Sequence, residues 1–149
     1  MIWSSREPKA IETAEIVADE LGVPAKIADG LEEHHRDNVP FLSPKEKFEE
    51  AVERLFRCPD RLVLGRETAN HARDRFTAAI DEVIDAGQSD SIVVTHGTVM
   101  TLFVASFPGV ERMAFWRRLG LPSYVVLTLS DMRIKSIVEG VTEVGPSAD

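Results

Sequence analysis

The residue best placed to do chemistry in this sequence is His96, which directly follows the apolar run Ile92-Val93-Val94-Thr95. Such a β-branched run is typical of a central parallel strand that is covered on both faces. In open α/β sheets ligands bind at the carboxyl ends of the strands, where His96 would lie. Gly97 would let a ligand approach the backbone, and Thr98 would open a helix whose free N–H groups attract anions. The segment therefore predicts a phosphate or similar anion beside His96; the alternative is a histidine that only hydrogen-bonds into a turn.

The elements that must position His96 follow from hydrophobic periodicity. Apolar residues from Ala10 to Leu21 form one helical face, and Gly22 ends that helix. Ser43, Pro44 and Glu46 have the spacing of a capping box, which predicts the start of a helix that closes at Cys58-Pro59. Three further helices are expected: one from near Thr68 to Gly87, one over about 98–107 and one over 110–119.

Short apolar segments predict the strands. They lie at Ile2–Ser4, Ala25–Ala28, Ser91–Thr95, Tyr124–Leu129 and Met132–Val138, the last two joined by a turn at Ser130-Asp131. Strands that alternate with helices predict an α/β fold with three αβα layers and a mostly parallel sheet. We expect a single domain over residues 1–149, with a flexible polar tail at 141–149.

Composition narrows the classes of function. The formal net charge of −8 disfavours nucleic acid as a partner, since phosphate backbones require basic surfaces. The apolar runs are too short to span a bilayer, and the N-terminal residues do not form a signal peptide, so we expect no membrane association. The one cysteine, Cys58, allows no disulfide within the chain. A cytoplasmic protein is the expectation.

Several segments resemble, in order, those of a known family. Ser4-Ser5-Arg6-Glu7-Pro8-Lys9-Ala10-Ile11-Glu12-Thr13-Ala14 resembles an SSPLxRAxQTA motif, and Asp29-Gly30-Leu31-Glu32-Glu33 resembles an LxE motif. Gly65-Arg66-Glu67 before a long helix, followed by the Val93–Gly97 strand end, resembles a GES…VVSHG run. The order and spacings agree from about residue 1 to residue 107. On these motifs the chain is identified as a member of the histidine phosphatase superfamily, and the resemblance implies a phosphoglycerate mutase-like fold.

The resemblance implies a site and a reaction. In the family a strand-end Arg-His-Gly histidine accepts the phosphoryl group, while a second histidine, arginines and a carboxylic acid surround the phosphate. His96 matches the second histidine and Glu33 the acid, so these two are the candidate catalytic residues. Lys9 stands where the family has an arginine, which keeps the charge but loses the two-pronged grip on phosphate. Arg6 is the candidate that would compensate, and Gly97 and Thr98 complete the predicted phosphate-binding set. No cofactor and no metal are implied.

The family's Arg-His-Gly segment is absent from these residues, because Met1 stands directly before the Ile2–Ser4 strand and none of the four histidines lies in such a motif. The leading hypothesis is therefore a phosphoglycerate mutase-like pseudoenzyme that keeps an anion pocket for inorganic phosphate or a small phosphorylated metabolite. One alternative is an active phosphomonoester phosphatase, either using His96 or shortened at its N-terminus. The other is a non-catalytic interaction module, because loss of an inner strand would expose a sheet region through which the chain could form homo-oligomers.

A metal site is the competing interpretation of Glu32-Glu33-His34-His35. Adjacent side chains point in different directions, and no further ligand pair is evident in the sequence. A solvent-exposed polar loop is the simpler interpretation of His34 and His35.

Overall fold

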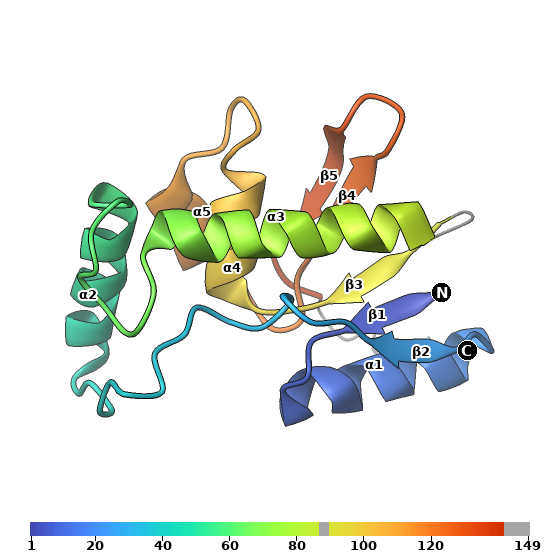
Figure 1. Cartoon of the computed structure of the whole chain (residues 1–149), viewed down its shortest axis with the longest axis horizontal. Helices are drawn as coiled ribbons and strands as arrows, with labels where there is room; N and C mark the ends of the chain where they lie inside the picture. The colour runs from blue at the N-terminus through green and yellow to red at the C-terminus, as the bar shows by residue number, and fades with distance from the viewer. Residues whose placement is uncertain (87–89, 142–149) are drawn as a thin grey trace, which may run out of the picture.

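A three-stranded parallel sheet forms the centre of the computed structural model, which describes residues 1–86 and 90–141 (Figure 1). The strands are β1 (Ile2–Ser4), β2 (Ala25–Ile27) and β3 (Ile92–Val94), in the order β2-β1-β3. β1 lies in the middle, with Ile2 opposite Ala25 on one side and opposite Ile92 on the other. The α/β class predicted from the sequence is confirmed.

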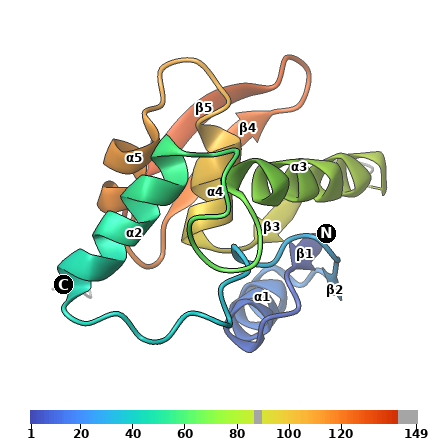
Figure 2. The same ribbon diagram turned by 60° about the vertical axis from the view of Figure 1, so that its left-hand side comes forward.

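Helices cover both faces of this sheet. They are α1 (Pro8–Leu21), α2 (Lys45–Arg57), α3 (Ala69–Ala86), α4 (Gly97–Val104) and α5 (Arg112–Arg118). Because side chains alternate along a strand, Ile2 packs with Ala14 and Ala18 of α1, whereas Trp3 faces the main core cluster that includes α3 and α4. Figure 1 shows α1 and α3 on opposite sides of the strands. In Figure 2 α2 lies beside α5, a contact made in part by the rings of Phe48 and Trp116.

Among the described strands β3 lies at the edge of the sheet, so the prediction of a central strand is wrong. Both of its faces are nevertheless in contact with the core, since Val93 packs against the main cluster and Val94 against the cluster of Ile2 and α1. Within the described ranges only β1 pairs with it, and Ile92 is 42% exposed. The remaining strands, β4 (Tyr124–Thr128) and β5 (Arg133–Val138), form a separate antiparallel hairpin with an irregularity between Val126 and Leu127. An apolar β-branched run therefore does not distinguish an edge strand from an inner one here.

The helix ends predicted from the sequence agree with the structure at Gly22 and differ from it at Ser43. Gly22 ends α1 in the left-handed conformation, with φ of 62°, as predicted. The capping box at Ser43 is wrong, since α2 begins at Lys45 after an extended Pro44 that provides no side-chain cap. Gly87 and the tail at 142–149 lie outside the described residues. No helix of the described part is long and apolar enough to cross a membrane.

A buried cation fastens the loop after β2 to α3. The Arg75 guanidinium pairs with Glu67 at 2.6 Å, and the two side chains are only 16% and 3% exposed. The same guanidinium donates to the carbonyl oxygens of Gly30, Glu32 and Glu33 at 2.8–3.2 Å. The Glu67 carboxylate in turn accepts from the His35 backbone N–H at 3.0 Å. These bonds fix the path of residues 30–35, which carry Glu33.

Replacing Arg75 with methionine is expected to destabilise the fold by about 3–5 kcal/mol, because it leaves the Glu67 carboxylate buried without its counter-charge. Urea unfolding measures this change. Arg73→Met is the matched control on the same helix: Arg73 pairs with the exposed Asp74, so its loss should cost at most about 1 kcal/mol. Equal losses in the two variants would contradict a structural role for the Arg75 cluster.

Candidate functional site

The parallel pairing of β1 with β3 brings together two segments that carry polar and titratable side chains, one after each strand. The Ser5 backbone N–H donates to Val94 O at 3.1 Å, so the residues after β1 lie beside those after β3. As a result, Ser5 Oγ is 2.7 Å from His96 Nε2, and Glu7 Oε1 is 3.3 Å from the same nitrogen. His96 itself is only 7% exposed. The sequence prediction that His96 lies at a strand end is met, and Glu7 is its nearest carboxylate.

These contacts indicate which imidazole nitrogen carries the hydrogen. A carboxylate only accepts hydrogen bonds, so Glu7 Oε1 is satisfied if Nε2 is protonated. Ser5 Oγ already accepts from the Glu7 backbone N–H at 3.2 Å and is free to accept from Nε2–H as well. We therefore assign the hydrogen to Nε2, which makes this nitrogen a donor toward an anion.

The Glu7 carboxylate is held by three groups at once. Besides His96 Nε2, Lys9 Nζ lies 3.6 Å from Oε2, and the Glu33 backbone N–H donates to Oε1 at 2.8 Å. A histidine donor, an ammonium group and a backbone N–H are also the kinds of group that bind a phosphate oxygen. The Glu7 carboxylate thus occupies three groups that another anion at this place would also use.

The Glu33 side chain bonds to the start of α4. Its carboxylate accepts from the backbone N–H groups of Thr98 and Val99, both at 3.1 Å, so it caps the N-terminus of α4. Burial opposes its ionisation, but the Arg36 guanidinium and the backbone N–H groups of His34 and Thr98 outweigh burial and keep the pKa of Glu33 below its usual value. It is therefore a carboxylate at neutral pH. Its role as the acid stays a prediction.

Arg36 is a cation of the site that the sequence interpretation missed. Its guanidinium lies 3.4 Å from Glu33 Oε2 and donates to Thr98 Oγ1 at 3.2 Å. It follows no recognised motif, and only the fold of the loop brings it to α4. Ser5 and Glu7 were also missed, although their place directly after an apolar strand was a signal that could have indicated them.

The predicted phosphate-binding residues are only partly brought together. Lys9 reaches the His96 site through Glu7. Arg6 turns away from it and pairs with Asp29 and Glu32. The N–H of Thr98 is already bonded to Glu33, and Gly97 begins α4 beside it. An anion-binding role for Arg6, Gly97 and Thr98 stays a prediction.

The other histidines lie around Glu67. His34 is buried, with Nε2 at 2.9 Å from the Glu67 carbonyl oxygen, so its expected solvent exposure is wrong. The cause is the Arg75 cluster, which draws this loop against α3. His35 is exposed as expected, and both His35 and His71 point a ring nitrogen toward the Glu67 carboxylate.

His96 is a neutral base in its resting state. Burial lowers the pKa of His96 below the ordinary 6.5, and Lys9 and Arg36 add to this effect, while the Glu7 and Glu33 carboxylates oppose it. Because the folded pKa lies below the unfolded one, the unfolded chain binds more protons between the two values. Neutral His96 therefore contributes stability above about pH 6.5 that is lost as the pH falls through the folded pKa.

The expected titration midpoint of the His96 ring, followed by NMR, is below 6.5. Glu7→Gln should lower the midpoint further, because it removes a carboxylate that favours the protonated ring. Glu12→Gln, an exposed change on the same helix, is the control and should leave the midpoint where it is. A midpoint at or above 6.5 in the unmodified chain would contradict the neutral assignment.

Comparison with known proteins identifies the family and the fold of the chain. The family model of the histidine phosphatase superfamily (branch 1) matches residues 1–139. Two solved structures share the fold. Bacillus stearothermophilus YhfR is 19% identical, with a TM-score of 0.63 over 95% of this chain and 74% of that one. A mycobacterial protein, hydrolase 1, is 17% identical, with a TM-score of 0.59 over 80% of this chain. The chain spans 63% of the length of the mycobacterial protein. No curated protein matches.

The fold is therefore mixed α/β of the phosphoglycerate mutase-like kind, as the sequence predicted. With a family match over residues 1–139, the chain belongs to the histidine phosphatase superfamily.

Proposed function

We propose that these 149 residues bind inorganic phosphate and small phosphomonoesters at His96 and do not by themselves transfer the phosphoryl group. The observation that carries the proposal is that His96 Nε2, Lys9 Nζ and the Glu33 N–H all contact the Glu7 carboxylate. A phosphate oxygen makes the same kinds of contact as a carboxylate oxygen. A bound phosphate would take the place of the Glu7 carboxylate, whose side chain is about one-third exposed.

The same residues support the lack of phosphoryl transfer. Phosphohistidine chemistry needs one imidazole to attack phosphorus and other groups to stabilise the charge that develops. Of the histidines in the described residues, His96 alone follows a strand. The ring nitrogens that contact other groups in His34, His35 and His71 contact Glu67. A single neutral imidazole with Lys9 nearby supports binding better than a two-histidine reaction.

Isothermal titration of phosphate into the chain tests the proposal. His96→Gln, which keeps much of the ring's volume, and His96→Ala should both weaken binding by about tenfold or more, the range for a hydrogen bond to a charged group. Glu7→Gln should strengthen binding by about tenfold, because it removes the competing charge. Glu12→Gln makes the same change in net charge and should have little effect. Binding that is unaffected by both Glu7→Gln and His96→Gln would refute the site.

The alternative is an active phosphomonoester phosphatase. Two observations favour it: burial lowers the pKa of His96 and leaves a neutral imidazole that can act as a base, and the similar mycobacterial protein is named a hydrolase. Metal-independent release of phosphate that disappears in His96→Ala would establish this activity and overturn the inactive assignment. An in-frame Arg-His-Gly encoded upstream of Met1 would identify the missing nucleophile.

A second candidate function is self-association through the sheet. Within the described residues the outer edge of β3 pairs with no strand, and Ile92 on it is exposed. Free N–H and C=O groups along one edge can pair with the same edge of a second copy. Light scattering at two concentrations should show the mass rising toward that of a dimer, and Ile92→Lys should restore the monomer. A monomer at the higher concentration would contradict this candidate.

A further inference from the structure

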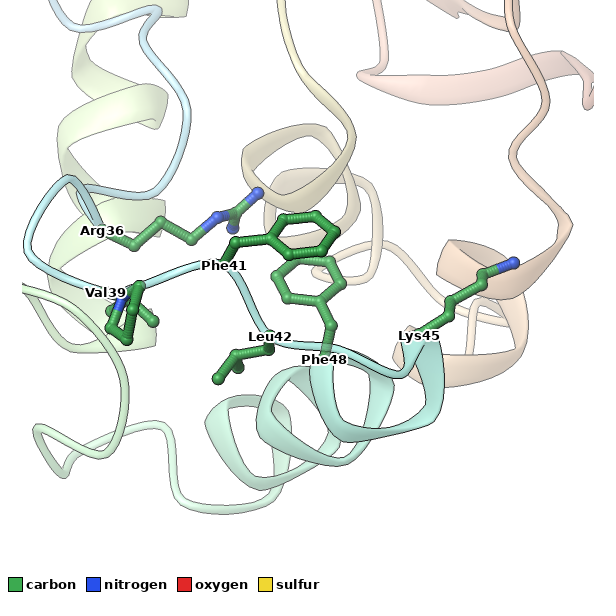
Figure 3. Close-up of a pocket in the computed structure, with 7 residues that line it drawn as sticks. Arg36, Val39, Phe41, Leu42, Lys45 and Phe48 are labelled. Atoms are coloured by element: carbon green, nitrogen blue, oxygen red, sulfur yellow. The ribbon is translucent and has the colours of Figure 1, made fainter.

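A cavity of about 380 Å³ opens beside Arg36, between the loop that follows Glu33 and the first turn of α2 (Figure 3). Its lining residues are Arg36, Val39, Pro40, Phe41, Leu42, Lys45 and Phe48. The volume falls within the range of small-molecule sites. Arg36 is the residue that this lining shares with the surroundings of His96.

The lining is apolar with positive charge and no carboxylate. Five of the seven lining residues are apolar and the other two are cationic, in a chain whose formal net charge is −8. The Lys45 ammonium pairs with Glu49 at 3.7 Å, and Figure 3 shows it extending away from the two phenylalanine rings. The guanidinium of Arg36 reaches toward those rings instead. Because Arg36 also pairs with a carboxylate, that of Glu33, the lining offers mainly apolar surface to a ligand.

The two phenylalanines differ in how firmly they are held. Phe48 packs against Trp116, with ring centroids 5.9 Å apart, and Arg36 lies 5.1 Å above its ring. It forms a fixed wall. Phe41 is 94% exposed, so a large aromatic ring stands in water at the mouth of the cavity. Covering that ring with an apolar ligand would remove its surface from water.

Arg36 connects the cavity with the anion site. Its two terminal guanidinium nitrogens contact Thr98 Oγ1 and Glu33 Oε2 beside the start of α4. The carbon between them, Cζ, lies over the ring of Phe48. Glu33 in turn donates its N–H to Glu7, which contacts His96. Arg36 therefore contacts both the cavity wall and the residues around His96.

We propose that the cavity formed by Val39, Phe41, Leu42 and Phe48 binds the apolar body of an organic phosphate, aromatic or branched aliphatic, whose phosphate lies at His96. The proposal rests on the phosphate site proposed above. It names the class of ligand: monoesters with an apolar body, in preference to inorganic phosphate or to esters with a hydroxylated body such as glycerol phosphate.

Titration calorimetry with inorganic phosphate, glycerol phosphate and phenyl phosphate tests this class. Phenyl phosphate should bind about tenfold more tightly than the other two, because its ring is taken out of water against Phe41 and Phe48. Phe41→Ser should reduce the affinity for phenyl phosphate to that for inorganic phosphate and leave the latter unchanged. Since Phe41 is exposed, this substitution should not alter the urea midpoint.

The matched control is Leu121→Ser, because Leu121 is 99% exposed and lies outside the cavity lining. It should leave all three affinities unchanged. Equal affinities for phenyl and inorganic phosphate, with phosphate binding still dependent on His96, would overturn this inference and leave the proposed function standing. Phenyl phosphate binding that needs Phe41 but is unaffected by His96→Gln would contradict the connection between the two sites and would also count against the phosphate site.

Discussion

The pairing of β1 with β3 is the constraint on which the rest of the site depends. It places the residues after β1 directly beside His96, as the bonds of Ser5 to Val94 O and to His96 Nε2 show. The opposite side of the site is set by the loop after β2, which the buried Arg75 ties to α3 through three carbonyl oxygens. Glu33 then joins the two sides, with its N–H at Glu7 and its carboxylate on the first N–H groups of α4. A change in the strand pairing would therefore move Ser5 relative to His96, and a change in the Arg75 cluster would move Glu33.

We propose an anion site in which the chain's own carboxylates take the anion's place. The N-terminus of α4 is satisfied by Glu33, and the donors around His96 are satisfied by Glu7. This arrangement gives each donor a partner before any ligand arrives, and it makes a phosphate that enters compete with a carboxylate. The two carboxylates differ in how easily they can be displaced. Glu33 accepts two helix N–H groups and an arginine, whereas the Glu7 side chain is partly exposed and faces a neutral histidine and an exposed lysine. Glu7 is accordingly the group that a ligand would replace.

Features set by neighbouring residues in the sequence could be predicted, and features set by distant ones could not. Gly22 ends its helix and His96 follows its strand because the signals are local. The LxE resemblance pointed to Glu33. The bonds of Glu33 to α4, however, join it to residues that lie 65 and 66 positions further along the chain, and no sequence pattern predicts such contacts. The edge position of β3 depends on which strand is beside it rather than on its own residues. Ser43 failed as a cap because the extended Pro44 delays the helix to Lys45. Arg36 was missed for the same reason as the α4 contacts, since only the fold brings it to the start of α4.

The central claim is that Glu7 stands in for a phosphate at His96. A crystal of the chain soaked in phosphate tests it most directly, because it shows both the anion and the carboxylate. The account predicts a phosphate within hydrogen-bonding distance of His96 Nε2 and Lys9 Nζ, with the Glu7 side chain turned toward solvent. Glu7 still in contact with His96, and no anion beside that histidine, would contradict it.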